Sequence, residues 1–280
     1  MEYRGIFDTH AHYDDERFDE DRDTVLGSLA GHGVSLVVDP ACDLASCEKT
    51  LALSEKYDFL YSAVGLHPHS AESDGEGNWL QKVADFSKQG KVVAIGEIGL
   101  DYHYDFSPRE KQIEVFAAQL GLANDLGLPV IIHDREAHAD TFELVKKYRP
   151  KGIIHCYSGS AEMAKEFVKL GMYIGFTGSV TFKNANKLLF AAAEVPEDRI
   201  LLETDCPYMA PVPYRGTRCD STLIPATAER LAEIRGTDVQ TLIDRARENG
   251  CRVYGITEEK KLESEESRGQ DLNLPNGKTA

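Results

Sequence analysis

The apolar positions of this 280-residue chain alternate between two patterns. Short apolar runs, many rich in β-branched residues, recur at intervals of roughly 20 to 40 residues, as expected of buried β-strands. The eight predicted strands are 5–10, 35–40, 60–67, 92–100, 129–133, 152–157, 172–178 and 200–205.

Most gaps between these strands place apolar residues three and four positions apart, which predicts amphipathic helices. The predicted helices are 17–30, 44–56, 79–88, 109–126, 141–148, 161–170 and 183–193, with 222–235 and 238–253 after the last strand. A strand followed by a helix, repeated eight times, is the pattern of a (β/α)₈ TIM barrel. We therefore predict an α/β fold with one domain over residues 1–256.

The connections between predicted elements indicate which end of the barrel carries the chemistry. Glycines precede many strands and can cap the preceding helix, which keeps the helix-to-strand turns short. The connections that follow strands are longer, above all 65–78, 101–108 and 206–221. TIM barrels place their active sites on this side. An open doubly wound sheet is the alternative, but it usually has a glycine-rich first turn, which residues 8–10 do not provide.

Composition limits the classes of function. The chain has 31 Lys and Arg against 47 Asp and Glu, a net charge of −16, which argues against a general nucleic-acid coat protein. Bound divalent ions reverse the local sign, so an enzyme acting on nucleic acid remains open. Six cysteines without a C-x-x-C pair predict reduced thiols. No apolar run reaches 18 residues and no signal-peptide layout is present, so we expect a cytoplasmic protein without membrane contact.

Residues 257–280 are rich in charge, poor in apolar residues and without aromatic ones. This composition predicts a polar, acidic and disordered C-terminal tail.

Histidines two positions apart end the first predicted strand, in Asp8-Thr9-His10-Ala11-His12. Side chains on a strand alternate between faces, so Asp8, His10 and His12 are expected to point the same way. At roughly 3.3 Å per residue, the two histidines lie about 7 Å apart along the backbone, which lets both imidazoles reach one cation.

Four further ionisable residues lie at strand ends, namely Glu97, His133, His155 and Asp205. Such groups are costly to bury unless they are paired or metal-bound, and closing the barrel gathers them at one mouth. Mixed imidazole and carboxylate ligands suit Zn²⁺, Mn²⁺, Co²⁺ or Fe²⁺, whereas Mg²⁺ prefers more oxygen. Six ligands are too many for one catalytic ion and suit two ions about 3.5–4 Å apart that share a carboxylate.

With these residues in view, the chain resembles the TatD family of metal-dependent hydrolases, within the amidohydrolase-like barrel superfamily. The resemblance runs from Asp8 to about Tyr254. Its motifs are DTHAH (8–12), GLHPH (65–69), GEIGLDY (96–102), HDREA (133–137), HCYSG (155–159), GFTG (175–178) and ETDCPYMAPVPYRG (203–216).

The resemblance implies deoxyribonuclease activity, often as a 3′-to-5′ exonuclease on single-stranded DNA. It further implies that His10, His12 and Asp205 hold one metal ion, that His133 and His155 hold a second, and that Glu97 bridges both. The native metal stays open among Zn, Mn, Mg and Co.

A hypothesis for the mechanism follows. Two bound ions lower the pKa of a water from 15.7 toward about 7 and offset charge on the phosphoryl oxygens. Glu97 and Asp205 are the predicted catalytic carboxylates, with Asp205 taking the proton of the water. The predicted substrate-binding residues are His67, by the resemblance, Tyr102 as one of several mouth-loop aromatics that stack on bases, and Arg215 for flanking phosphates.

Two alternatives stay open at this stage. The same paired metals can cleave esters and amides, so a deacylase acting on a substrate such as aminoacyl-tRNA is the second choice. A non-catalytic metal-holding scaffold would need coordinatively filled ions, which a ligand set divided between two ions does not provide. The expected partner is single-stranded DNA as substrate, and we expect a monomer.

Overall fold

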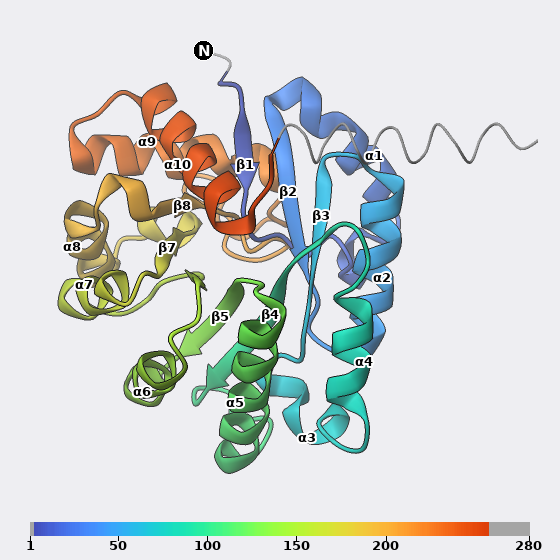
Figure 1. The fold of residues 1–280 in the computed structure, drawn as a ribbon. Coiled ribbons are helices and arrows are strands. Elements are labelled where there is room, and N and C mark those ends of the chain that lie inside the picture. Colours follow the sequence, from blue (N-terminus) through green and yellow to red (C-terminus); the bar gives the residue numbers. More distant parts are fainter. Residues whose placement is uncertain (1–2, 258–280) are drawn as a thin grey trace, which may run out of the picture.

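The computed structural model describes residues 3–257 as eight parallel strands enclosed by helices (Figure 1). The strands are β1 (Ile6–Asp8), β2 (Val34–Pro40), β3 (Leu60–Val64), β4 (Val92–Asp101), β5 (Val130–Arg135), β6 (Gly152–Ile154), β7 (Tyr173–Phe176) and β8 (Ile200–Leu202). The helices are α1 (Arg22–Ser28), α2 (Leu44–Lys56), α3 (Ala71–Asp74), α4 (Trp79–Phe86), α5 (Arg109–Leu126), α6 (His138–Tyr148), α7 (Ala161–Lys169), α8 (Asn186–Glu194), α9 (Ile224–Arg235) and α10 (Val239–Tyr254). The predicted single-domain TIM barrel is confirmed.

The strands pair in sequence order from β1 to β8, and backbone bonds beyond the two outer strands close the barrel. The N–H of Thr9 donates to the carbonyl of Leu202 over 3.1 Å, and the N–H of Asp205 donates to the carbonyl of His10 over 2.9 Å. This seam joins the chain after β1 to the chain after β8, and so brings His10 next to Asp205.

Alternation along the strands determines which residues point into the barrel. On β5, Ile131 lies in the interior cluster, whereas Val130 and Ile132 pack against the helices. His133 occupies the next inward position after Ile131. Inward apolar residues therefore form a layer beneath the polar residues of the mouth.

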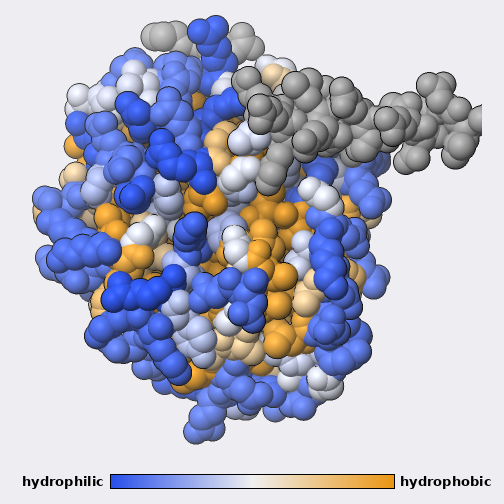
Figure 2. Space-filling view, in the orientation of Figure 1, coloured by the Kyte–Doolittle hydropathy of each residue, from blue (hydrophilic) through white to orange (hydrophobic). Residues whose placement is uncertain are grey.

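The last helix covers the barrel end opposite to the mouth. Tyr254 and Ile256 join the buried interior cluster, and the hydroxyl of Tyr254 donates to the carbonyl of Thr9 over 2.8 Å. In Figure 1, α10 crosses the middle of the molecule in front of β1 and β8. In the same orientation, Figure 2 shows hydrophobic residues in the middle of this face and hydrophilic residues on the surrounding helices.

Several elements differ from their predicted bounds. Predicted strands 152–157 and 200–205 stop at Ile154 and Leu202, where their ladders end. Predicted helix 17–30 becomes a 3₁₀ turn over Glu16–Phe18 and the shorter α1, since Asp21 has a non-helical backbone between them. The predicted tail lies outside the described residues, except for its first position. Within residues 3–257, no helix combines the length and apolarity needed to cross a membrane.

Candidate metal centre

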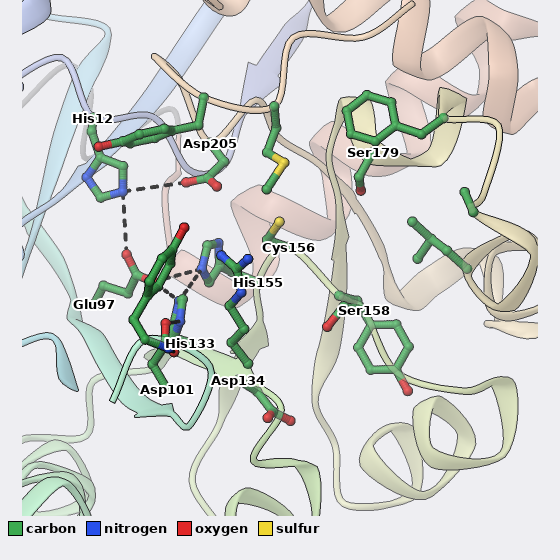
Figure 3. Close-up of a pocket in the computed structure, with 18 of the residues that line it drawn as sticks. His12, Glu97, Asp101, His133, Asp134, His155, Cys156, Ser158, Ser179 and Asp205 are labelled. Atoms are coloured by element: carbon green, nitrogen blue, oxygen red, sulfur yellow. Dashed lines mark hydrogen bonds and ion pairs between the residues drawn. The ribbon is translucent and has the colours of Figure 1, made fainter. Parts of the chain in front are cut away.

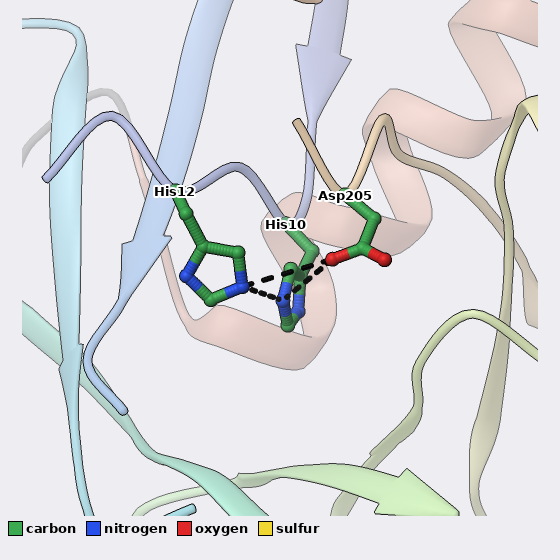
Figure 4. Close-up of side chains that lie close together, drawn as sticks. All are labelled: His10, His12 and Asp205. Carbon is green, nitrogen blue, oxygen red and sulfur yellow. Dashed lines mark hydrogen bonds and ion pairs between the residues drawn. The ribbon is translucent and has the colours of Figure 1, made fainter. Parts of the chain in front are cut away.

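Four ligand atoms from three parts of the chain meet at the barrel seam. The Nε2 atoms of His10 and His12 lie 3.0 Å apart, and each lies within 3.4 Å of Oε2 of Glu97. Oδ1 of Asp205 lies 3.8 and 3.7 Å from the same two nitrogens (Figure 4). Ligand bonds of about 2.0–2.1 Å place neighbouring ligand atoms on one ion about 3 Å apart, so this set fits a single metal ion.

The other oxygen of Glu97 faces a second set of imidazoles. Oε1 of Glu97 lies 2.9 Å from Nδ1 of His133 and 2.7 Å from Nε2 of His155, and these nitrogens are 3.4 Å apart. Figure 3 shows His12, Glu97, His133, His155 and Asp205 together on one side of a large pocket. One carboxylate therefore lies between two separate groups of metal-type ligands.

Glu97 is almost fully buried, with 2% of its surface exposed. Burial alone would raise the pKa of this carboxyl, but the imidazoles of His155, His67 and His10 outweigh that effect and hold the pKa well below its usual range. Glu97 thus stays ionised and presents both oxygens as ligands.

Hydrogen bonds fix which nitrogen of two of these rings faces the centre. Nδ1 of His12 donates to the carbonyl of Pro40 over 3.0 Å, which leaves Nε2 with a free lone pair. Nε2 of His133 lies 3.0 Å from Oδ2 of Asp101, which leaves Nδ1 for an ion. Partners of this kind orient metal-binding histidines, so the arrangement fits a metal centre.

Comparison with known proteins identifies the family. Residues 7–255 match the family model described as TatD related DNase. The chain belongs to the TatD family. It is 40% identical over 254 residues to the uncharacterized metal-dependent hydrolase YabD of Bacillus subtilis. The alignment covers 90% of this chain and 99% of that protein.

Two further relatives support the assignment of this TatD-family chain. It is 33% identical over 258 residues to the 3′-5′ ssDNA/RNA exonuclease TatD of Cronobacter sakazakii, covering 89% of this chain and 97% of that protein. The crystal structure of YjjV, a TatD homolog from Escherichia coli K12, superposes with a TM-score of 0.84 at 32% identity, covering 90% and 98% of the two chains. The protein is thus a metal-dependent hydrolase.

Asp101 lies within the TatD motif GEIGLDY, and the sequence alone predicted no role for it. The carboxylate of Asp101 accepts hydrogen bonds from Nε2 of His133 and Nε2 of His69, each 3.0 Å away. It also accepts hydrogen bonds from the backbone N–H groups of His103 and Tyr104. Burial raises the pKa of Asp101, but these partners, His133 first, outweigh it and lower the pKa. Asp101 follows Glu97 by four positions on the same strand. Residues an even number of positions apart share a face of a strand, so this spacing could have predicted that Asp101 also points to the mouth.

The expectation that Asp8 shares the direction of His10 and His12 is wrong. Strand β1 ends at Asp8, so strict alternation does not continue to the histidines. The buried Asp8 carboxylate instead accepts bonds from the hydroxyls of Thr204 and Ser221, at 2.6 and 2.7 Å. Asp8 therefore links the end of β1 to the chain that follows β8, beside the candidate metal centre.

The predicted substrate-binding residues occupy different places. His67 and Arg215 line a cavity of about 1470 Å³ above the ligands, and Tyr102 does not. The hydroxyl of Tyr102 donates to Asp140 over 2.7 Å, and the guanidinium of Arg109 lies over its ring. The structure therefore brings His67 and Arg215, but not Tyr102, to the cavity at the mouth.

Proposed function

We propose that this TatD-family protein is a nuclease that removes nucleotides from the 3′ ends of single-stranded DNA with two divalent metal ions. The observation that carries the proposal is the shared carboxylate of Glu97, whose two oxygens face two separate imidazole sets. A relative that is 33% identical over almost the whole chain is named a 3′-5′ ssDNA/RNA exonuclease, which supports the choice of substrate.

In this proposal His10, His12 and Asp205 would hold one ion, His133 and His155 would hold the other, and the carboxylate of Glu97 would be shared by both sets. The nitrogen-rich ligand set suits Zn²⁺, Mn²⁺ or Co²⁺. When bound, two such ions make hydroxide available at neutral pH and offset charge on a phosphodiester.

Asp205 is the proposed proton acceptor. Its side chain is 15% exposed, against 0–3% for His10, His155 and Glu97, so it is open to a water molecule in the cavity. Burial raises the pKa of Asp205 above its ordinary value, and the imidazole of His155 opposes that shift. The exposed edge of Asp205, rather than this shift, supports the role, because a bound cation would lower the pKa again.

His67 is the proposed phosphate contact. Its Nδ1 accepts the backbone N–H of His69 over 3.1 Å, so the ring proton lies on Nε2, which points to the centre 3.6 Å from Oε1 of Glu97. Burial lowers the pKa of His67 well below its usual value, so the ring is neutral. A protonated Nε2 cannot ligate a metal ion but can donate to a phosphoryl oxygen.

The deciding experiment uses a short single-stranded DNA labelled at either end, incubated with Mg²⁺, Mn²⁺ or Zn²⁺. We expect mononucleotides to be released from the 3′ end, and no release with EDTA or with Glu97→Ala protein purified in parallel. If the DNA stays intact while ester or amide substrates such as aminoacyl-tRNA are hydrolysed, the protein is a deacylase and this proposal is wrong.

A further inference from the structure

The cavity above the metal centre continues to one side, away from the ligands. Figure 3 shows Ser158 and Ser179 across the pocket from His12 and Glu97. The loops after β6, β7 and β8, with the start of α8, build this region. We define the cationic arm of the cavity as Ser158, Ser179, Phe182, Lys183, Lys187 and Arg215, all of which line it.

The three cations of the arm have no carboxylate partner among residues 3–257. Arg215 lies with its guanidinium 4.0 Å from the centre of the Phe182 ring, and the exposed Lys183 and Lys187 form no ion pair. By contrast, Lys165 on the neighbouring helix α7 pairs with Glu194 at 2.9 Å. Exposed lysines without an ion pair among residues 3–257 also occur outside the cavity, at Lys82 and Lys151. Here three unpaired cations gather around one cavity of a chain with 16 more acidic than basic residues, which favours an anionic ligand.

The arm is held together by contacts between two loops. The N–H of Val212 donates to the hydroxyl of Thr181 over 2.8 Å. Gly178 packs so closely that a Cβ there would come within 2.1 Å of the carbonyl oxygen of Met209. Phe182, which follows Thr181, and Arg215, from the loop after β8, are therefore positioned together.

We propose that the cationic arm is a second nucleotide subsite, which binds the phosphate next to the scissile one. Lys183, Lys187 and Arg215 supply the positive charge for that phosphate, and the Ser158 and Ser179 hydroxyls supply hydrogen bonds. The inference rests on the proposed nuclease function and adds that the site selects oligonucleotides over diesters with a single phosphate.

The test compares the 5′-(p-nitrophenyl) ester of thymidine monophosphate, which has one phosphate, with thymidine oligonucleotides of three to six residues, which have two or more. The variant is Lys183→Met/Lys187→Met. The matched control is Lys82→Met/Lys151→Met, since these exposed lysines lie outside the cavity and the control removes the same charge.

Wild-type kcat/KM is expected to rise from the single-phosphate ester to the oligonucleotides. The arm variant should lose about tenfold in kcat/KM on the hexanucleotide and less than about twofold on the ester. It should also show a shallower salt dependence, by about 0.7 in the log–log slope for each lost phosphate contact.

Three results would overturn the subsite: no dependence on length in the wild type, an equal loss on both substrates in the arm variant, or an equal loss in the control. Because the single-phosphate ester reports on the metal centre alone, its cleavage in any of these cases would leave the proposed function standing. Failure of the wild type on every nucleotide substrate would refute the proposed function, and the subsite with it.

Discussion

The two ends of this barrel are filled in opposite ways, although the same eight strands build both. At the mouth, His10 and Glu97 are 0% and 2% exposed, so ionisable groups are packed against one another. At the other end, Phe7 and Tyr254 pack apolar rings with centroids 6.0 Å apart. Buried charge is costly without a partner ion, whereas buried apolar surface stabilises the fold.

The difference indicates that chemistry and stability are carried by separate ends. Removing a ligand at the mouth should abolish turnover without loosening the metal-free fold. Removing a contact at the closed end should weaken the fold and leave turnover of the folded molecules intact. Four experiments test this separation.

The largest effect is expected for Asp205→Asn. We expect kcat/KM to fall by about 10³-fold or more, about 4 kcal/mol, because a ligand and proton acceptor is lost. The thermal midpoint of the metal-free variant should not fall, since burial raises the pKa of Asp205 and so disfavours its charge. Asp23→Asn, an exposed residue on α1, is the control. Normal turnover in the variant would contradict the assignment.

Metal loading should stabilise the protein through the mouth alone. At a free metal concentration of 100 times Kd, one site adds about 2.7 kcal/mol to the free energy of unfolding. Denaturant unfolding with and without Zn²⁺ or Mn²⁺ measures this gain. Glu97→Ala should lose most of it, because both ligand sets include that carboxylate. An undiminished gain in Glu97→Ala would place the metal elsewhere.

Asp101→Asn is expected to act through His133. Loss of a carboxylate that orients a metal-binding histidine costs about 10- to 100-fold in metal affinity or activity. Metal titration of the variant measures the loss, and Asp105→Asn, in the loop that follows β4, is the control, since Asp105 pairs with Arg109 at the surface. Equal affinities in the two variants would remove Asp101 from the site.

The smallest effect is expected at the closed end. Tyr254→Phe removes the donor to the buried Thr9 carbonyl and should lower the free energy of unfolding by about 1–2 kcal/mol. Turnover per folded molecule should not change. Tyr148→Phe, at a partly exposed helix end, is the control for loss of a hydroxyl. A drop in kcat with an unchanged unfolding midpoint would show that the two ends are not separate.

Local signals explain why much of the fold was predictable. Helix α2 begins and ends where predicted, since Asp43 and Ser46 form a capping box at its start. Helix α5 ends as predicted at Leu126, because Gly127 adopts the left-handed conformation after it. His133 was predicted at the mouth because it ends the apolar run 129–133, and it does line the cavity there.

What failed depends on geometry that no local pattern records. The directions of Asp8 and His10 depend on where β1 ends, and the chain just after β1 bonds to Leu202 and Asp205, almost 200 residues away. Tyr102 was assigned to the mouth because it lies in a mouth loop, but its direction is set by Asp140 on α6. Arg218, three positions after Arg215 in the same loop, does not line the cavity and pairs with Asp21 at 2.6 Å.

The position of Glu97 between both imidazole sets has a consequence for how the protein takes up metal. If two ions bind as proposed, the first would orient the carboxylate of Glu97 for the second. Loading should therefore be cooperative, and a preparation with half its metal should be a mixture of empty and full molecules. Its activity would then follow metal content in direct proportion.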